Sequence, residues 1–188
     1  KTKIIGEDVK LEFVGFGTMN GKDGKPFKTR DGGVLRLEKL LEDVNEQVLD
    51  KMKDRDMDKD MIDDAAAKIS LAAIKYGDLS NQASKDYIFD VDRFTSFEGN
   101  TGPYILYTIV RTKSLLAKVK AQNITVDEKS AIEPADSKSE TDVMLALTKW
   151  SETVNAAFEE HAPHKICQFV YELSDTFNKF YHENKIVT

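Results

Sequence analysis

The sequence predicts a mainly α protein in which a helical bundle follows a small strand-and-loop segment. Apolar residues recur at helical spacing in several long stretches, the latest of which occupy the C-terminal half of the chain. Pro103 and Pro163 stand at the starts of two of these stretches, and proline is favoured in the first turn of a helix. By contrast, the turn dipeptides Asn20-Gly21 and Asp23-Gly24 lie near the N-terminus.

In the N-terminal part, apolar residues first alternate with charged residues and only later recur at helical spacing. Val9, Leu11 and Phe13 alternate with charged residues, which predicts a strand. Residues 34–37 fit either a short return strand or the entry to the next helix. A helix is expected over residues 38–54, with one apolar stripe formed by Leu37, Leu41, Val44, Val48 and Met52.

Six further regions follow along the chain. A second helix ends near Gly77, a residue that suits the position after a helix, and its stripe is Ile62, Ala66, Ile69, Ala73 and Tyr76. Residues 78–101 predict irregular chain with short helical pieces, and residues 123–139 predict a loop. The other helices are expected from Pro103 to about Lys120, along the stripe Val143, Leu147, Trp150, Val154 and Ala157, and from Pro163 along Ile166, Phe169 or Val170, Leu173, Phe177 and Phe180.

Composition limits the classes of function. The chain has 188 residues, with 27 Lys and Arg against 33 Asp and Glu, and a net charge of −6. This balance argues against indiscriminate nucleic-acid binding, so any RNA contact must come from a local basic or aromatic patch. The single cysteine, Cys167, allows no internal disulfide and indicates a reducing compartment, for which we expect the cytoplasm. No apolar run approaches the ~20 residues of a membrane span, and no membrane partner is expected.

The most informative segment is the cationic loop at residues 22–33 (KDGKPFKTRDGG). Its potential anion contacts are Lys22, Lys25, Lys28, Thr29 and Arg30. Glycines allow close backbone approach, and free N–H groups beside cations suit phosphate. The loop lacks the spacing of either common glycine-rich nucleotide motif, so composition alone leaves a simple basic turn as the alternative.

The helix after Pro103 carries a second candidate site. Tyr104, Tyr107, Arg111, Ser114 and Lys118 recur at i, i+3, i+7, i+10 and i+14, which places them on one face. Two aromatic rings followed by two cations suit base stacking and phosphate binding. The alternative is that the tyrosines pack at the edge of the bundle while the cations are solvated.

The last helix has a polar and aromatic flank formed by Tyr171, Ser174, Asn178 and Tyr181. This flank faces either RNA or the neighbouring helix, and spacing does not decide between them. His161, His164 and Cys167 stand at intervals of three, but a structural zinc site usually needs four ligands and the chain has no second cysteine. No metal site is therefore expected.

Several sequence blocks, and the order in which they occur, resemble those of arginyl-tRNA synthetases, which are class I aminoacyl-tRNA synthetases. The matching blocks cover nearly the whole chain except residues 121–141. They are FGTM at residues 16–19, the cationic loop, AIKYGDLS at 73–80, KDYIFD at 85–90, SFEGNTGPY at 96–104, APHKIC at 162–167 and YEL at 171–173.

The resemblance implies an enzyme that attaches arginine to its tRNA using ATP with Mg²⁺. It implies catalytic roles for Lys28 and Arg30, and ATP binding by these two residues with Lys25 and Thr29. It also implies tRNA binding by Tyr104, Tyr107, Arg111, Lys118 and Tyr171, with no DNA partner. The fold implied is a class I anticodon-binding bundle preceded by the end of the catalytic domain.

The same resemblance suggests three parts. Residues 1–37 would end the catalytic domain, residues 38–97 would connect and contact the tRNA stem, and residues 98–188 would form an anticodon-binding bundle truncated at its C-terminal end. The histidine-containing first class I motif and the βαβ nucleotide fold are missing from this sequence. We therefore expect a fragment that is inactive alone and holds no bound ATP.

Some residues depart from the family pattern. Aligning residues 27–30 with the general class I motif places Pro26 and Thr29 where lysines are expected, so Lys28 and Arg30 are neighbours of the expected cations. Ala83 replaces a frequent arginine, and Val91 replaces a frequent tryptophan. Both changes weaken any transfer of tRNA-contact roles to residues 81–92.

Two other classes of function remain open from the residues alone. A non-catalytic helical module that binds protein would suit the acidic charge and the mixed helices. A self-contained nucleotide-binding protein would suit the cationic loop, although no parallel-sheet half is visible. The order of the motifs favours the synthetase interpretation.

Overall fold

The computed structural model describes residues 6, 9–26, 36–54, 57–124, 129 and 131–187, and within them the chain is mainly helical, as predicted. Two short strands accompany the helices. In chain order the elements are β1 (Met19–Asn20), α1 (Leu37–Met52), α2 (Lys59–Leu79), β2 (Tyr87–Ile88), α3 (Val91–Phe94), α4 (Gly102–Ala121), α5 (Lys138–Thr148), α6 (Trp150–Glu159) and α7 (Pro163–Glu183).

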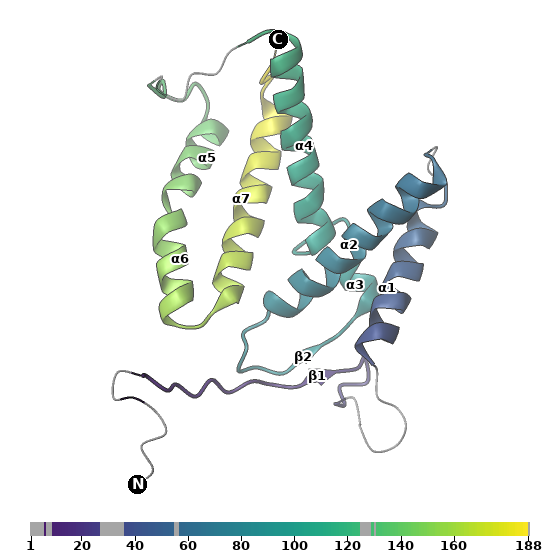
Figure 1. Ribbon diagram of the computed structural model, residues 1–188. Helices are drawn as coiled ribbons and strands as arrows, with labels where there is room; N and C mark the ends of the chain where they lie inside the picture. The colour runs from purple at the N-terminus through teal and green to yellow at the C-terminus, as the bar shows by residue number, and fades with distance from the viewer. Residues whose placement is uncertain are drawn as a thin grey trace.

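The helices form two groups that meet along α2 (Figure 1). Helices α1 and α2 pack as an antiparallel pair on one side. On the other side, α7 lies between α4 and the consecutive helices α5 and α6. Helix α2 contacts both α4 and α7, so it joins the pair to the bundle. Within the described residues, no helix is both long and apolar enough to cross a membrane.

Both proline-initiated helices begin as the sequence predicted. Pro103 lies in the first turn of α4, and the Thr101 hydroxyl caps that helix by accepting a hydrogen bond from the Tyr104 N–H at 3.3 Å. Such a cap satisfies one of the backbone donors that a helix start leaves free. Pro163 lies in the first turn of α7. The start of α4, on which the candidate site is built, is therefore fixed by local sequence.

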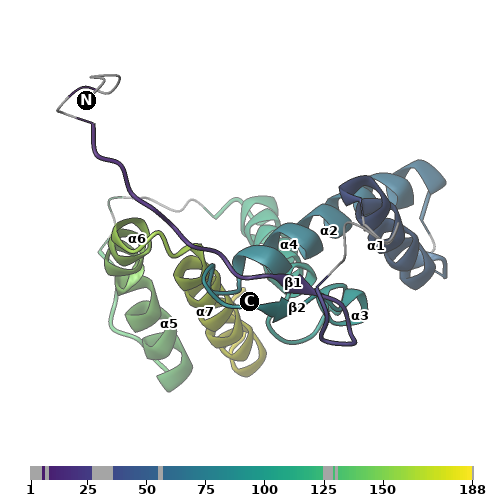
Figure 2. The same cartoon turned by 90° about the horizontal axis from the view of Figure 1, so that it is seen from below.

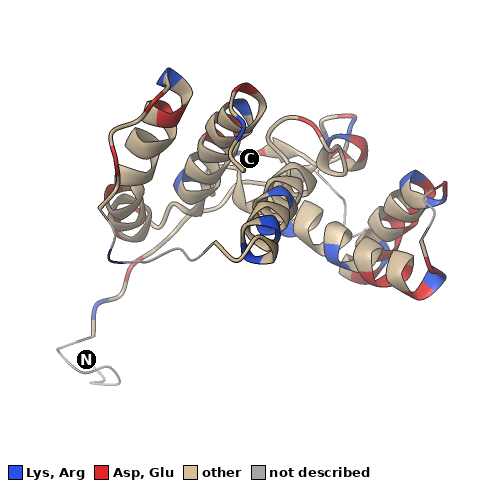
Figure 3. Cartoon of the chain, turned by 90° about the horizontal axis from the view of Figure 1, so that it is seen from above, with Lys and Arg blue, Asp and Glu red and all other residues tan. Residues whose placement is uncertain are grey.

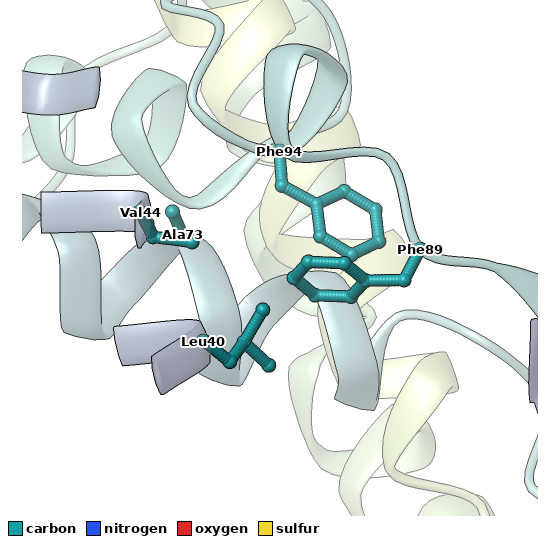
Figure 4. Packing of buried hydrophobic residues seen from close by; sticks show 5 residues of the cluster. All are labelled: Leu40, Val44, Ala73, Phe89 and Phe94. Carbon is teal, nitrogen blue, oxygen red and sulfur yellow. The ribbon is translucent and has the colours of Figure 1, made fainter. Parts of the chain in front are cut away.

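One core lies between α1, α2 and α3 (Figure 4). Phe89 and Phe94 meet edge to face, with ring centroids 4.8 Å apart. The buried face of α1 consists of Leu40, Val44, Val48 and Met52. The predicted stripe was right for the last three, but Leu37 is exposed and Leu41 only half-buried. A spacing of four keeps Leu40 in line with Val44, whereas Leu37 is the first residue of α1.

Gly77 is not the residue that follows α2, as the sequence suggested, because the helix continues to Leu79. Its buried backbone faces the Phe94 ring, and a Cβ at this position would lie 2.6 Å from Phe94 Cδ2. A contact that short forces a neighbour to shift. Gly77 thus makes room for the ring that attaches α3 to α2.

The predicted strand at residues 9–13 is also wrong for the described chain. Residues 9–18 run as an extended arm beneath the helices (Figure 2), and no described segment pairs with the backbone of residues 10–16. Phe13 is 94% exposed, and Val9 and Leu11 are exposed as well. Alternation in sequence creates a strand only when a neighbouring backbone accepts and donates the ladder hydrogen bonds. The Val34 and Leu35 positions, part of the proposed return strand, lie outside the described residues.

Candidate nucleic-acid interface

Helices α4 and α7 are joined by a buried amide. Asn178 is 8% exposed, and its Nδ2 donates to the Tyr104 hydroxyl at 3.0 Å and to Thr108 Oγ1 at 2.9 Å. Its Oδ1 accepts a hydrogen bond from Arg111 Nη1 at 2.6 Å. A buried amide that meets partners on both its oxygen and its nitrogen fixes the neighbouring side chains. Asn178 therefore sets where Arg111 and Tyr104 lie.

Arg111 lies against two aromatic rings. Its guanidinium carbon is 4.6 Å from the ring centroid of Tyr107 and 4.6 Å from that of Tyr181. Nη2 also donates to the Tyr107 hydroxyl at 2.5 Å, and Nη1 lies 3.4 Å from His182 Nε2. The two distances from the guanidinium carbon to the ring centroids are typical of cation–π contacts. The side chain is thus held in one orientation before any ligand arrives.

The predicted face of α4 divides into an outer and an inner part. Tyr107 is 48% exposed, whereas Tyr104 is half-buried and its ring lies 5.8 Å from that of Tyr171, measured between centroids. Burial raises the pKa of Tyr104, whose hydroxyl lies 3.4 Å from Asp175 Oδ1. Tyr104 and Tyr171 support the face from inside, and Tyr107 presents a ring to solvent.

Helix α4 carries only basic charges, all of them between its middle and its C-terminal end. Its charged residues are Arg111, Lys113, Lys118 and Lys120, and it contains no Asp or Glu, in a chain whose net charge is −6. Figure 3 shows blue on its ribbon and no red, while α1 and α2 carry both colours. Lys118 is exposed, near the C-terminal end of α4. An exposed ring with nearby cations can stack a base and hold the adjoining phosphates.

Sequence reasoning left the flank of α7 undecided and overlooked His182. Asn178 and Tyr181 of that flank face α4 and support Arg111. The signal was present in the spacing, since 171, 174, 178 and 181 share one face. What the sequence lacked was the direction of that face, which depends on how α7 packs against α4.

The cationic loop is described only in part. Lys25 is exposed, and its backbone N–H donates to Asp23 Oδ1 at 3.1 Å. Lys28, Thr29 and Arg30 lie outside the described residues. Lys22 is engaged in ion pairs with Asp90 and Asp92.

The two histidines at the start of α7 lie in different environments. His161 is exposed in the turn before α7 and contacts Glu12 of the N-terminal arm. His164 is half-buried, and Cys167 is buried inside α7, where burial raises the pKa of its thiol. Within the described part of the chain, no group of three or more His, Cys, Asp or Glu side chains is placed to hold a metal ion.

Two family profiles match consecutive parts of the sequence. Residues 1–91 match the catalytic domain of class I (R) tRNA synthetases. Residues 105–188 match the DALR anticodon binding domain, a range that contains nearly all of α4 and the whole of α7. Tyr107, Arg111 and Tyr181 therefore lie in the part that resembles an anticodon-binding domain, and Tyr104 directly precedes it.

Whole-chain comparisons agree with the profiles. The chain is 56% identical to the arginine–tRNA ligase of Agathobacter rectalis and 52% identical to that of Alkaliphilus oremlandii, in each case over its full length. It spans 33% and 32% of those two relatives, about a third of their length. Among solved structures, it shares its fold with the arginyl-tRNA synthetase of Thermus thermophilus, at a TM-score of 0.71 and 24% identity. That match covers 91% of this chain and 27% of the other. The Plasmodium falciparum enzyme gives a TM-score of 0.67 at 23% identity, covering 93% and 29%.

The fold and the two profiles together define an anticodon-binding helical bundle joined to part of a class I synthetase catalytic domain. The chain belongs to the arginyl-tRNA synthetase family and corresponds to a portion of such a protein.

Proposed function

We propose that this chain is the C-terminal part of an arginine–tRNA ligase, which attaches arginine to its tRNA using ATP. Within that enzyme it would bind the anticodon stem-loop through α4 and α7 and act on ATP through the cationic loop. The observation that carries the proposal is the half-exposed Tyr107 ring beside the fixed Arg111 guanidinium, on a basic helix within the anticodon-binding range.

The proposed binding mode divides the work between rings and cations. A loop base would stack on Tyr107, because an unpaired base offers a flat face that an aromatic ring covers. Arg111 would remain against Tyr107 and extend that surface. Lys118 would neutralise a phosphate, and Tyr104 and Tyr171 would hold the face in place from behind.

The proposed catalytic contribution comes from the cationic loop. Attack of the arginine carboxylate on the α-phosphate of ATP forms arginyl-adenylate and leaves negative charge on the departing pyrophosphate. Lys28 and Arg30 would stabilise that charge, with Lys25 and Thr29 as further phosphate contacts. Interactions stronger in the transition state than with bound ATP raise kcat. Mg²⁺ would accompany ATP in the whole enzyme, held by its phosphates.

We propose the same three parts as the sequence suggests. Residues 1–37 would close the catalytic domain, residues 38–97 would connect it to the bundle and contact the tRNA stem, and residues 98–188 would recognise the anticodon. Arginine binding and most ATP contacts would belong to other parts of the enzyme, so this chain alone would not form adenylate. The reducing compartment indicated by its single cysteine would be the cytoplasm.

The test is an arginylation assay on the full-length protein that contains this chain, with arginine, ATP and arginine tRNA. The proposal predicts charging of that tRNA, loss of charging when ATP is omitted, and no charging by the 188-residue chain alone. A full-length protein that binds a protein partner but neither binds nor charges tRNA would support the non-catalytic interaction module instead.

A further inference from the structure

The turn at residues 20–26, which contains the first residues of the cationic loop, is ordered by hydrogen bonds. Gly21 N–H donates to the Lys25 carbonyl at 2.9 Å, and Gly24 N–H donates to the Gly21 carbonyl at 2.9 Å. Gly24 has φ of +73°, in the region that favours glycine. Asn20 forms a bridge with Pro26, which closes the turn at residues 20–26. This turn therefore has a defined shape that an outside contact can orient.

That outside contact is made by Lys22. Its Nζ lies 2.6 Å from Asp92 Oδ2 and 3.1 Å from Asp90 Oδ1, at the start of α3. We name these three residues the Lys22 ion-pair cluster. Asp92 raises the pKa of Lys22 and Lys22 lowers that of Asp92, so both remain charged. The cluster joins positions 70 residues apart in sequence.

The surface that receives Lys22 is firmly attached to the helical part. Asp90 also caps α3 by accepting from the N–H groups of Asp92 and Arg93. Phe94 at the end of α3 fills the notch left by Gly77 on α2. Lys51 of α1 donates to the Thr95 hydroxyl at 2.7 Å. Lys22 thus ties the turn to a fixed point of the helical part.

A second connection lies immediately before the turn. Strands β1 and β2 pair in parallel, with Met19 opposite Tyr87 and Asn20 opposite Ile88. Asp86 Oδ1 accepts a hydrogen bond from the Thr18 N–H at 2.7 Å. The strand pair fixes the base of the turn, whereas Lys22 acts nearer its tip. Because the strand pair and the Lys22 ion pairs hold the turn at two different positions, together they fix its direction. With only one of these contacts, the turn could rotate about that contact.

We propose that Lys22 is a positioning residue: its ion pairs with Asp90 and Asp92 hold the turn at residues 20–26, which contains the first residues of the cationic loop, against α3. This inference rests on the proposed function, because the loop is taken to act on ATP. A competing role for Lys22 is direct contact with a phosphate, as its place among the loop cations suggests.

The cluster acts on geometry rather than on global stability. The Lys22 and Asp92 side chains are 61% and 67% exposed, and exposed ion pairs contribute little to the free energy of unfolding. Catalysis is more sensitive, since a small misplacement of a reacting group can lower the rate by up to about a hundredfold. We therefore expect substitutions to change kcat and local exchange while leaving the melting temperature nearly unchanged.

The experiment compares Lys22→Met, Lys22→Arg and the double variant Asp90→Asn/Asp92→Asn in the full-length protein. Lys68→Met is the matched control, because Lys68 also forms an exposed ion pair, with Asp64 on α2. The first readout is kcat and KM for ATP in ATP–pyrophosphate exchange with arginine and tRNA. The second is hydrogen–deuterium exchange of the amides of Gly21 and Gly24.

We expect Lys22→Met and the double asparagine variant to lower kcat by similar factors, about tenfold, with KM for ATP nearly unchanged. Both should speed exchange at Gly21 and Gly24, and Lys22→Arg should restore much of both properties. A double asparagine variant with normal kcat beside an impaired Lys22→Met would show direct phosphate contact and overturn the inference.

The two readouts separate this inference from the proposed function. Unchanged amide exchange in Lys22→Met would overturn the positioning role even if the enzyme charges tRNA normally. Faster amide exchange in a protein without any arginine-dependent activity would overturn the proposed function and, with it, the catalytic consequence claimed for Lys22.

Discussion

Asn178 of α7 accepts a 2.6 Å hydrogen bond from Arg111 of α4, and this contact fixes the only arginine of α4 against the rings of Tyr107 and Tyr181. The same amide donates to Tyr104 and Thr108. A ligand that meets Arg111 therefore meets a side chain whose rotamer has already been selected. Such preorganisation lowers the cost of ordering a long side chain on binding.

Replacing Asn178 with alanine should damage both stability and the site. The change leaves the buried hydroxyl of Thr108 and the Arg111 guanidinium without this partner, so the free energy of unfolding should fall by about 1–3 kcal/mol. Chemical denaturation measures this loss, with Asn155→Ala as the control because Asn155 is exposed on α6. A double-mutant cycle with Arg111→Ala isolates the pair, and zero coupling would contradict the role assigned to it.

Tyr107→Ala should weaken binding of arginine tRNA by about 1–3 kcal/mol, the usual scale for one stacked base. Phe158→Ala is the matched control, since Phe158 is another exposed aromatic residue, on α6. A fluorescence or filter-binding titration gives both affinities. If the Tyr107 variant bound tRNA with wild-type affinity, the ring would not stack on a base and its role would be structural only.

Lys118→Gln should reduce the slope of log K against log salt by about one unit, because one phosphate contact is lost. Arg111→Ala should reduce the slope similarly if its guanidinium also faces a phosphate, but it should also lower stability through the lost bond to Asn178. Titrations at several salt concentrations separate these effects. Lys59→Gln, an exposed lysine at the start of α2, should leave the slope unchanged.

In the full-length enzyme, Lys28→Ala and Arg30→Ala should each lower kcat more than they raise KM for arginine. If each cation acts on developing pyrophosphate charge as an oxyanion donor would, each loss is worth roughly 2–4 kcal/mol. Steady-state ATP–pyrophosphate exchange checks this, with Lys149→Ala as a surface control. Normal kcat in both variants would exclude the loop from catalysis.

The helices were predictable because their signals are local. Pro103 and Pro163 mark the starts of α4 and α7, and Val44, Val48 and Met52 keep one period through α1. The errors arose where a second segment decides the outcome. Val9, Leu11 and Phe13 have the alternation of a strand but no described partner strand. Gly77 was interpreted as a helix end, whereas it lies inside α2, where the Phe94 ring occupies the space that a side chain at this position would fill.

The candidate site was predictable as a set of residues but not as an arrangement. Spacing placed Tyr104, Tyr107 and Arg111 on one face of α4, and it grouped Asn178 with Tyr181 on α7. The distances between these two faces depend on the packing of α4 against α7, which no local pattern encodes. For the same reason, the turn dipeptides predicted a turn near Lys22, but not its contact with Asp90 and Asp92.

The central claim is that the α4–α7 face recognises the anticodon of arginine tRNA. The most direct measurement compares the affinity of the full-length protein for arginine tRNA with its affinity for the same tRNA carrying replaced anticodon bases. We predict at least about tenfold tighter binding of the natural anticodon, equivalent to about 1.4 kcal/mol. Tyr107→Ala should weaken binding of both tRNAs by a similar factor, because stacking on a ring does not depend on the identity of the base. Equal affinity of the wild-type protein for the two tRNAs, or unchanged affinity for both in Tyr107→Ala, would contradict the account.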